Sequence, residues 1–201
     1  MRKPFWKYYG ATWSVVCVDQ IFKLWVHHHM VLGYAGTIPL MGSSLKLCYV
    51  LNPGMAFGIQ FYPPYGKLLL TLGRILITYA IIRHIEKLRR ERPLSTRSSR
   101  AWTWILGGAV GNSIDSIFYG VLLENAPHDA PIAWGHGQVI DMIHLDLWRG
   151  QLPTWVPFMK ECNVHLFPIF NLADVAILVG MLMILCSPGG CRIYRSGSPT
   201  H

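Results

Sequence analysis

Residues 107–115 read GGAVGNSID, and this stretch decides how the chain folds. It ends a long apolar run with an asparagine and an aspartate, Asn112 and Asp115. A second apolar run contains FNLAD at 170–174, in which an asparagine again precedes an aspartate by three residues. Two hydrophobic segments carry the same N-x-x-D pattern, which suggests that they supply two halves of one polar site.

The composition around these motifs is typical of a membrane protein. Of 201 residues, 52% are hydrophobic and 14% are charged, whereas soluble domains carry about 25% charged residues. A membrane-spanning helix needs about 20 mostly apolar residues. Four windows satisfy this length: 11–32, 66–85, 101–123 and 166–186. We therefore expect one membrane domain over residues 1–201, with an all-α fold of four transmembrane helices.

The basic residues predict how these helices cross the membrane. Lysine and arginine concentrate in the N-terminal segment, in the linker RHIEKLRRERPLSTRSSR at 83–100 and in the C-terminal tail. The other two connections, 33–65 and 124–165, contain only Lys46, Arg149 and Lys160. Because cytoplasmic loops are enriched in basic residues, we expect both termini and residues 86–100 inside, and both long loops outside. The net charge of +8 then reflects topology and anionic lipid, and we expect no nucleic-acid partner.

The outer loop 124–165 predicts a small cap on the helices. A 42-residue connection without structure of its own would be unusual in a compact domain. The stretch GQVIDMIHLDL at 137–147 favours short strands within this cap.

Asp115 and Asp174 are expected at matching depths in the membrane. Asp115 lies eight residues before the outer end of its window at Leu123, and Asp174 lies eight residues after the outer start of its window at Leu166. At 1.5 Å per residue, both lie about 12 Å below the outer helix ends. Carboxylates inside a membrane face the bundle interior, and two opposed carboxylates share a proton. The pattern therefore predicts an acid and a base side by side, as in an aspartic protease.

Other interpretations of the same residues remain open at this point. The aspartates could form structural ion pairs with Lys23, Lys67 or Arg74, or a proton relay in a small transporter. Asn112 and Asn171 share a helix face with the aspartate that follows each of them, so they orient it, bind substrate backbone or join helices. Gly107 and Gly111 form a GxxxG pattern, which favours close helix packing.

Five sequence blocks resemble the lipoprotein signal peptidase family, also called signal peptidase II. They are DQIFK at 19–23, NPGMAFG at 52–58, GGAVGNSIDS at 107–116, VIDMI at 139–143 and FPIFNLAD at 167–174. The resemblance implies an aspartic endopeptidase in the bacterial inner membrane, with its active site near the periplasmic side and the cap in the periplasm. Its substrates would be diacylglyceryl-modified prolipoproteins, cut just before the lipidated cysteine.

The resemblance also assigns site residues. Asp115 and Asp174 take the positions of the catalytic pair. The positions tied to the substrate site or its support are Asp19, Lys23, Asn52, Gly54, Asn112, Asp141 and Asn171. We expect no metal and no cofactor, and a monomer surrounded by lipid.

Two features depart from the family pattern. The family usually has arginine after the first catalytic aspartate, but this chain has Ser116. A contact made by that arginine must be supplied elsewhere or lost. The segment VLLENAPHDAPIAWGHGQ at 121–138 is also longer than the pattern suggests, so we expect an enlarged cap.

Three further features have alternative interpretations. His27, His28 and His29 are adjacent on a helix, point in different directions and fit an interfacial polar patch better than a metal site. Ser113 raises the alternative of a serine nucleophile, although it points away from the Asp115 face. A Cys48–Cys162 disulfide is conceivable in an oxidising compartment.

Overall fold

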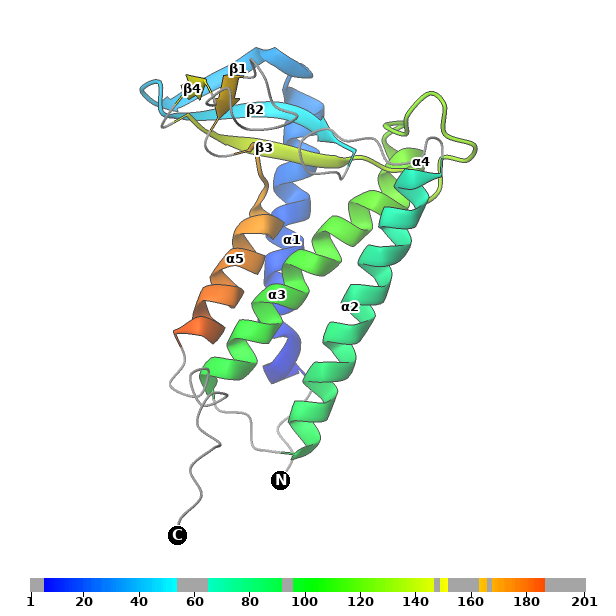
Figure 1. The fold of residues 1–201 in the computed structure, drawn as a ribbon, viewed down its shortest axis with the longest axis vertical. Coiled ribbons are helices and arrows are strands. Elements are labelled where there is room, and N and C mark those ends of the chain that lie inside the picture. Colours follow the sequence, from blue (N-terminus) through cyan, green and yellow to red (C-terminus); the bar gives the residue numbers. More distant parts are fainter. Residues whose placement is uncertain are drawn as a thin grey trace.

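The described part of the chain forms helices that stand against a small antiparallel sheet (Figure 1). In this computed structural model the described residues are 6–53, 65–91, 96–146, 149–151, 163–165 and 168–186. The main helices are α1 (Trp6–His29), α2 (Gly66–Glu91), α3 (Thr96–Ile114) and α5 (Leu172–Leu185). After α3 the chain continues through a π-helical turn, η2 (Asp115–Tyr119), into the short α4 (Gly120–Leu122).

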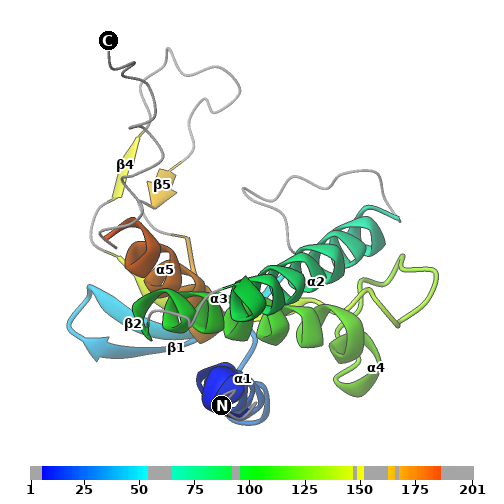
Figure 2. The same ribbon diagram turned by 90° about the horizontal axis from the view of Figure 1, so that it is seen from below.

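Helix α3 is the central helix and packs against α1, α2 and α5 (Figure 2). Glycines make the closest approaches possible. A Cβ atom on Gly108 would lie 2.2 Å from the carbonyl oxygen of Ala173 in α5, and one on Gly107 would lie 2.7 Å from Cβ of Val15 in α1. The expectation that the glycines of this motif permit close helix packing is confirmed.

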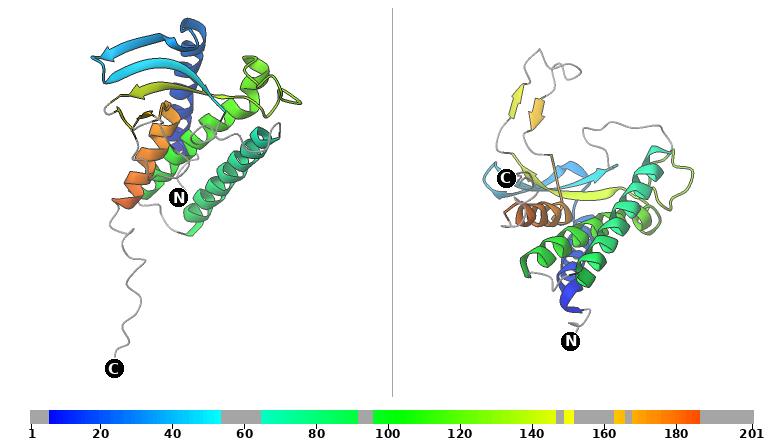
Figure 3. Two further views of the ribbon diagram at one scale, coloured as in Figure 1. Left: turned by 45° about the horizontal axis from the view of Figure 1, so that its top comes forward. Right: turned by 60° about the horizontal axis from the view of Figure 1, so that its bottom comes forward.

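The sheet crosses one end of the helices (Figure 3) and contains β1 (Gly33–Met41), β2 (Leu45–Asn52) and β3 (Val139–Leu145) in that order. All pairs are antiparallel, with Leu47 opposite Ile143 in the β2–β3 pair. The expected strand within 137–147 is confirmed as β3. The expected all-α fold is incomplete, because the segment 33–65, which we expected only as a loop outside the membrane, supplies β1 and β2. A separate two-stranded sheet pairs β4 (Arg149–Gln151) with β5 (Asn163–His165).

Sheet and helices meet in one apolar cluster. Its buried members are Val26 from α1, Met30 just after α1, Tyr49 from β2, Tyr119 from η2, and Ile140 and Met142 from β3. This cluster fixes β3 over the ends of α1 and η2, so that polar residues on these elements come close to one another.

The outward faces of the helices are apolar, as lipid contact requires. Exposed side chains include Trp13, Ile21 and Phe22 on α1, Leu72, Leu76 and Ile77 on α2, and Leu178, Leu182 and Leu185 on α5. Two of the four expected spans, within Gly66–Arg90 and Arg100–Leu122, have helices long and apolar enough to cross a membrane.

The first and last helices depart from the expected windows. Helix α1 has 24 residues and includes the charged Asp19 and Lys23. Helix α5 has 14 residues and begins at Leu172, so the boundary expected at residue 166 is wrong for the helix. The helix begins late because Phe170 is extended and pairs with Ile143 of β3, with backbone N–H···O distances of 2.8 and 3.0 Å.

We predict that Gly108→Ala destabilises the protein by about 1–3 kcal/mol, because the new methyl group overpacks the α3–α5 contact against backbone. The matched control is Gly73→Ala in α2, where a Cβ atom meets nothing within 4 Å. That change should be neutral or slightly stabilising, since alanine favours helix over glycine. Thermal unfolding in detergent micelles measures both. Equal melting temperatures for the two variants would contradict the packing argument.

Candidate active site

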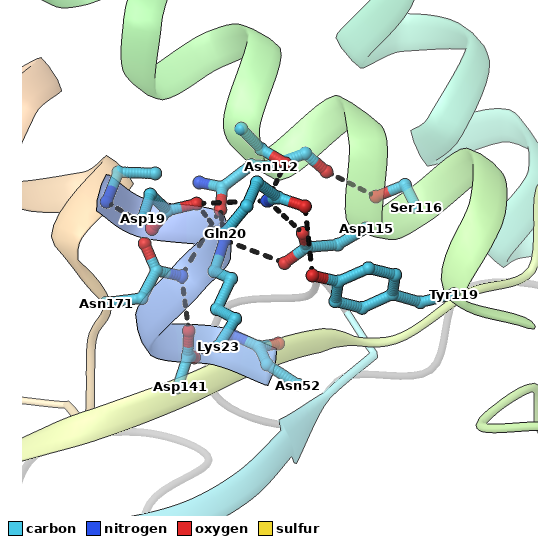
Figure 4. Close-up of polar contacts among 12 residues, drawn as sticks. Asp19, Gln20, Lys23, Asn52, Asn112, Asp115, Ser116, Tyr119, Asp141 and Asn171 are labelled. Atoms are coloured by element: carbon cyan, nitrogen blue, oxygen red, sulfur yellow. Dashed lines mark hydrogen bonds and ion pairs between the residues drawn. The ribbon is translucent and has the colours of Figure 1, made fainter. Parts of the chain in front are cut away.

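Asp115 lies at the first position of η2, where the helix widens, and its side chain is fully buried. Its Oδ2 is 2.7 Å from Nζ of Lys23, and Nε2 of Gln20 donates to its Oδ1 at 2.9 Å (Figure 4). Tyr119 in turn donates its hydroxyl proton to Oε1 of Gln20 at 2.9 Å. Asp115 is therefore held on both oxygens by groups from α1.

The loop after α4 completes the environment of η2. Widening a helix leaves carbonyl groups without their usual partners. The backbone N–H of Gly137 donates to the Ser116 carbonyl at 3.0 Å, and that of Gly135 donates to the Ile117 carbonyl at 3.1 Å. Asn125 and Gln138 exchange hydrogen bonds that close the intervening loop. Part of the long 121–138 segment thus supports the turn that carries Asp115.

Asp174 lies in the first turn of α5, where it forms a capping box with Asn171. The Asp174 backbone N–H donates to Oδ1 of Asn171 at 3.0 Å, and the Asn171 backbone N–H donates to Oδ2 of Asp174 at 3.3 Å. Asp174 is half-buried. A carboxylate in this position is also favoured by the positive end of the helix dipole.

Lys23 joins the two halves of the site. Its Nζ lies 2.8 Å from Oδ2 of Asp19 and 2.7 Å from Oδ2 of Asp115, and donates to Oδ1 of Asn112 at 3.0 Å. Nδ2 of Asn112 donates to Oδ1 of Asp174 at 2.8 Å. The two aspartates are connected through one ammonium group and one amide.

Asp19 fastens α5 to α1. Its Oδ1 accepts the backbone N–H of Ala173 at 2.9 Å, a group at the start of α5 that has no partner within the helix. Its other oxygen faces Lys23. The position of Asp174 therefore depends on the same lysine that holds Asp115.

Asp141 connects the site to the sheet. Nδ2 of Asn171 donates to its Oδ1 at 2.7 Å, and Nδ2 of Asn52 on β2 donates to its Oδ2 at 2.8 Å. Burial raises the pKa of Asp141 to about 7, and the hydrogen bonds from these two amides only partly oppose the rise. The charge on Asp174 raises this pKa further.

The structure brings the candidate residues Asp19, Lys23, Asn52, Asn112, Asp115, Asp141, Asn171 and Asp174 into one network. Gly54 lies outside the described residues. The depth argument was wrong in one respect: Asp174 is at the start of its helix and not eight residues inside it. The asparagines also act differently from each other, since Asn171 caps its own aspartate whereas Asn112 contacts the aspartate of the other motif.

The contacts of Asp115, Ser113 and Cys48 bear on the other interpretations of the sequence. Ion pairing of Asp115 with Lys23 is present, so this aspartate has a structural partner as well as its place in the network. The Ser113 hydroxyl donates to the Ala109 carbonyl at 2.7 Å and lies 3.2 Å from the Thr78 hydroxyl, away from the aspartates. Cys48 is a buried free thiol, and Cys162 lies outside the described residues.

Metal binding finds no support in the part of the chain that the structure describes. Among those residues, no group of three or more His, Cys, Asp or Glu side chains is placed to hold a metal ion. Nδ1 of His27 lies 2.8 Å from the Tyr49 hydroxyl, and the His27 and His28 rings contact each other edge to face.

Sequence reasoning missed three residues of the network. Gln20 lies within the DQIFK block but was not selected, although a polar side chain in an apolar span needs a partner. Tyr119 follows Asp115 by four residues, so the helical spacing alone placed it nearby. Arg74 was predicted only as a possible ion-pair partner of the aspartates, whereas in the structure it donates to the hydroxyl of Ser116.

Comparisons with known proteins point the same way as this geometry. A family model described as Signal peptidase (SPase) II matches residues 11–188. A lipoprotein signal peptidase of Amoebophilus asiaticus is 52% identical over 185 residues, which cover 92% of this chain and 78% of that protein. One from Porphyromonas gingivalis is 35% identical over 199 residues, covering 92% and 84%.

This chain belongs to the signal peptidase II family. It is therefore an aspartic peptidase, and the alternative of a proton-relay transporter is wrong. Two solved structures of bacterial membrane enzymes have the same fold as this family member. One has a TM-score of 0.64 at 19% identity and covers 100% of this chain and 98% of its own. The other has a TM-score of 0.61 at 21% identity and covers 92% and 95%.

We predict that Asp141 makes the stability of this peptidase pH-dependent. Its pKa is about 7 in the folded state and about 3.9 in an unfolded chain. Between these values the folded state holds a proton that the unfolded state has released, so stability falls as pH rises from about 4 to 7. The slope from this one group is at most about 1.4 kcal/mol per pH unit. Asp141→Asn should flatten it.

Melting temperatures of wild type and Asp141→Asn, measured from pH 4.5 to 8, test this prediction. The difference between the two curves isolates Asp141 from other titrating groups. Parallel curves over the whole range would show that Asp141 titrates normally.

Proposed function

We propose that Asp115 and Asp174 are the catalytic pair of this lipoprotein signal peptidase, which cleaves the signal peptides of prolipoproteins. The observation that supports this assignment is the short connection between them: Lys23 contacts Asp115 and Asn112, and Asn112 contacts Asp174. Two carboxylates from different helices thus meet in a polar cluster that is enclosed by apolar helix faces.

The chemistry follows from the two carboxylates. One, in its charged form, takes a proton from a water molecule, whose oxygen attacks the carbonyl carbon of the scissile peptide bond. The other, in its neutral form, gives a proton to the leaving nitrogen. Because the two groups interact, they titrate as a pair. The positive charge of Lys23 reduces the cost of holding several carboxylates in an apolar surrounding.

Different amides hold the two carboxylates at their positions. Asp115 accepts from Gln20, whereas Asp174 accepts from Asn112 and from the backbone N–H of Asn171. Positioning of this kind keeps the reacting groups in a productive geometry. Half-burial of Asp174 leaves this side of the pair accessible to a substrate that enters from the sheet end of the helices.

The proposed substrate is a prolipoprotein whose lipobox cysteine already carries diacylglycerol, and cleavage falls just before that cysteine. A lipidated substrate reaches the enzyme within the bilayer, along the apolar outer faces of α1, α2 and α5. We propose that the enzyme works as a monomer in the inner membrane.

The proposed topology has four spans, with both termini and residues 86–100 in the cytoplasm. Helix α1, with 24 residues, is about 36 Å long and exceeds the thickness of a bilayer core. Helix α5 is shorter, and the extended residues before it pair with β3. The sheet and the site then lie toward the periplasmic side, opposite the basic linker.

We predict that Asp115→Asn and Asp174→Asn each lower kcat by roughly 10³-fold or more, because asparagine keeps the shape of the side chain but transfers no proton. The double variant should be no worse than either single one, since groups that act as a unit are not additive. Ser113→Ala is the control and should keep wild-type activity. The assay follows the mass shift of a diacylglyceryl-modified prolipoprotein peptide. Cleavage by purified Asp174→Asn, free of host enzyme, would refute the assignment.

The topology predicts a labelling pattern in intact cells. A cysteine introduced at Asp129, an exposed residue of the cap, should react with an impermeant maleimide. A cysteine at Ser98 should react only after the cells are opened, because we place it in the cytoplasm. The unsubstituted protein gives the background from its own cysteines. Labelling at position 98 in intact cells would reverse the proposed orientation.

A further inference from the structure

Over residues 66–82, one face of α2 is polar, although the rest of this part of the helix is mostly apolar. Lys67, Thr71, Arg74 and Thr78 follow one another at intervals of four, three and four residues, so they share one face of the helix. Leu72, Ile75, Leu76 and Ile77 on the other faces are exposed. The polar face is therefore turned away from lipid and toward α3.

Three polar contacts fasten this face to the site. The Thr78 hydroxyl lies 3.2 Å from the Ser113 hydroxyl, and Thr71 donates to the Gly135 carbonyl at 2.6 Å. Between them, Nη1 of Arg74 donates to the Ser116 hydroxyl. Ser116 is fully buried and directly follows Asp115.

Arg74 is connected to both aspartates of the pair. The Ser116 hydroxyl donates a hydrogen bond to the Asn112 carbonyl at 2.9 Å, and the Asn112 side chain donates to Asp174 at 2.8 Å. The charge of Arg74 also interacts with the charges of Asp115, Asp174 and Asp141. Arg74 lies eight residues from the start of α2 at Gly66, about 12 Å along the helix. An arginine at this depth is costly unless it faces a polar interior.

We propose that Arg74 is a positioning residue for this peptidase and supplies from α2 the guanidinium that the family pattern places after the first catalytic aspartate. In this chain that position is occupied by Ser116, whose small side chain leaves room for the side chain of Arg74 from α2. In this chain the guanidinium comes from α2 and meets the small hydroxyl that follows Asp115. This inference rests on the proposed roles of Asp115 and Asp174.

This contact makes Arg74 necessary for catalysis more than for substrate binding. Through Ser116 and Asn112 it holds the backbone of α3 where the helix becomes η2. Small displacements of reacting groups are costly: about 1 Å lowers rates by about 100-fold. Arg74→Gln should therefore lower kcat by about 10- to 100-fold, with KM changed by less than about threefold. Arg74→Lys should keep part of the activity, because lysine keeps the charge but not the planar donors.

The matched control is Arg83→Gln on the same helix. Arg83 is nine residues from Arg74, which places it about 180° around the helix, and its side chain is exposed beside Tyr79. The same change of arginine to glutamine at this position should leave kcat and KM at the wild-type values.

The decisive test places the arginine at position 116, in η2, and a serine at position 74, in α2. Arg74→Ser should be as slow as Arg74→Gln, and Ser116→Arg alone should be impaired because it crowds two guanidinium groups into a fully buried position. The double variant Arg74→Ser/Ser116→Arg should recover at least tenfold in kcat over Arg74→Ser. Melting temperatures identify any variant that fails to fold. Recovery in the double variant cannot result from general destabilisation, because each of its two substitutions lowers kcat when made alone.

The outcomes separate this inference from the proposed function. Wild-type kcat in Arg74→Gln, or a folded double variant no faster than Arg74→Ser, overturns the role of Arg74. If either of these results occurs while Asp174→Asn is inactive in the same assay, the assignment of the catalytic pair is kept and only the role of Arg74 is rejected. If Asp174→Asn cleaves the peptide, the assignment of the pair is wrong and the role of Arg74 falls with it.

Discussion

The ammonium group of Lys23 is the contact on which the rest of the site depends. It is fully buried and lies within 2.8 Å of carboxylate oxygens from Asp19 and Asp115. A buried charge without partners is costly, and removing one member of such a group leaves the others uncompensated. Lys23 therefore requires α1, η2 and, through Asp19 and Ala173, the start of α5 to stay together. The same contacts that stabilise the helix bundle also set the distance between the two aspartates.

The sheet also holds part of the site in place. Strand β3 pairs with the chain just before α5 and thereby fixes where that helix begins. Asp141 on β3 accepts from Asn171, which caps α5 and positions Asp174. A change in the sheet is thus transmitted to Asp174, one of the two aspartates proposed as the catalytic pair, whereas Asp115 is held by η2 and α1. The cap and the membrane helices form one functional unit.

Close helix packing explains how so many polar groups fit among apolar helices. Helix α3 carries glycines toward both α1 and α5, and at Gly111 a Cβ atom would lie 2.7 Å from a carboxylate oxygen of Asp19. This face leaves space for the side chains of Asp19 and Lys23 beside the α3 backbone. The hydrophobic effect alone does not hold such helices together in lipid, so hydrogen bonds and close contact between backbones contribute more of the stability.

The sequence by itself determined the membrane class, the positions of α2 and α3, the strand β3 and most members of the network, because long apolar runs and buried charges are local features with few solutions in lipid. Tertiary structure alone decided that β1 and β2 form strands, since their side chains do not alternate between buried and exposed. It also decided that α5 begins at Leu172, where pairing with β3 ends. The crossed contact of Asn112 with Asp174, and that of Arg74 with Ser116, join residues distant in the chain. No sequence period encodes such contacts, because they depend on how the helices rotate against each other when they pack.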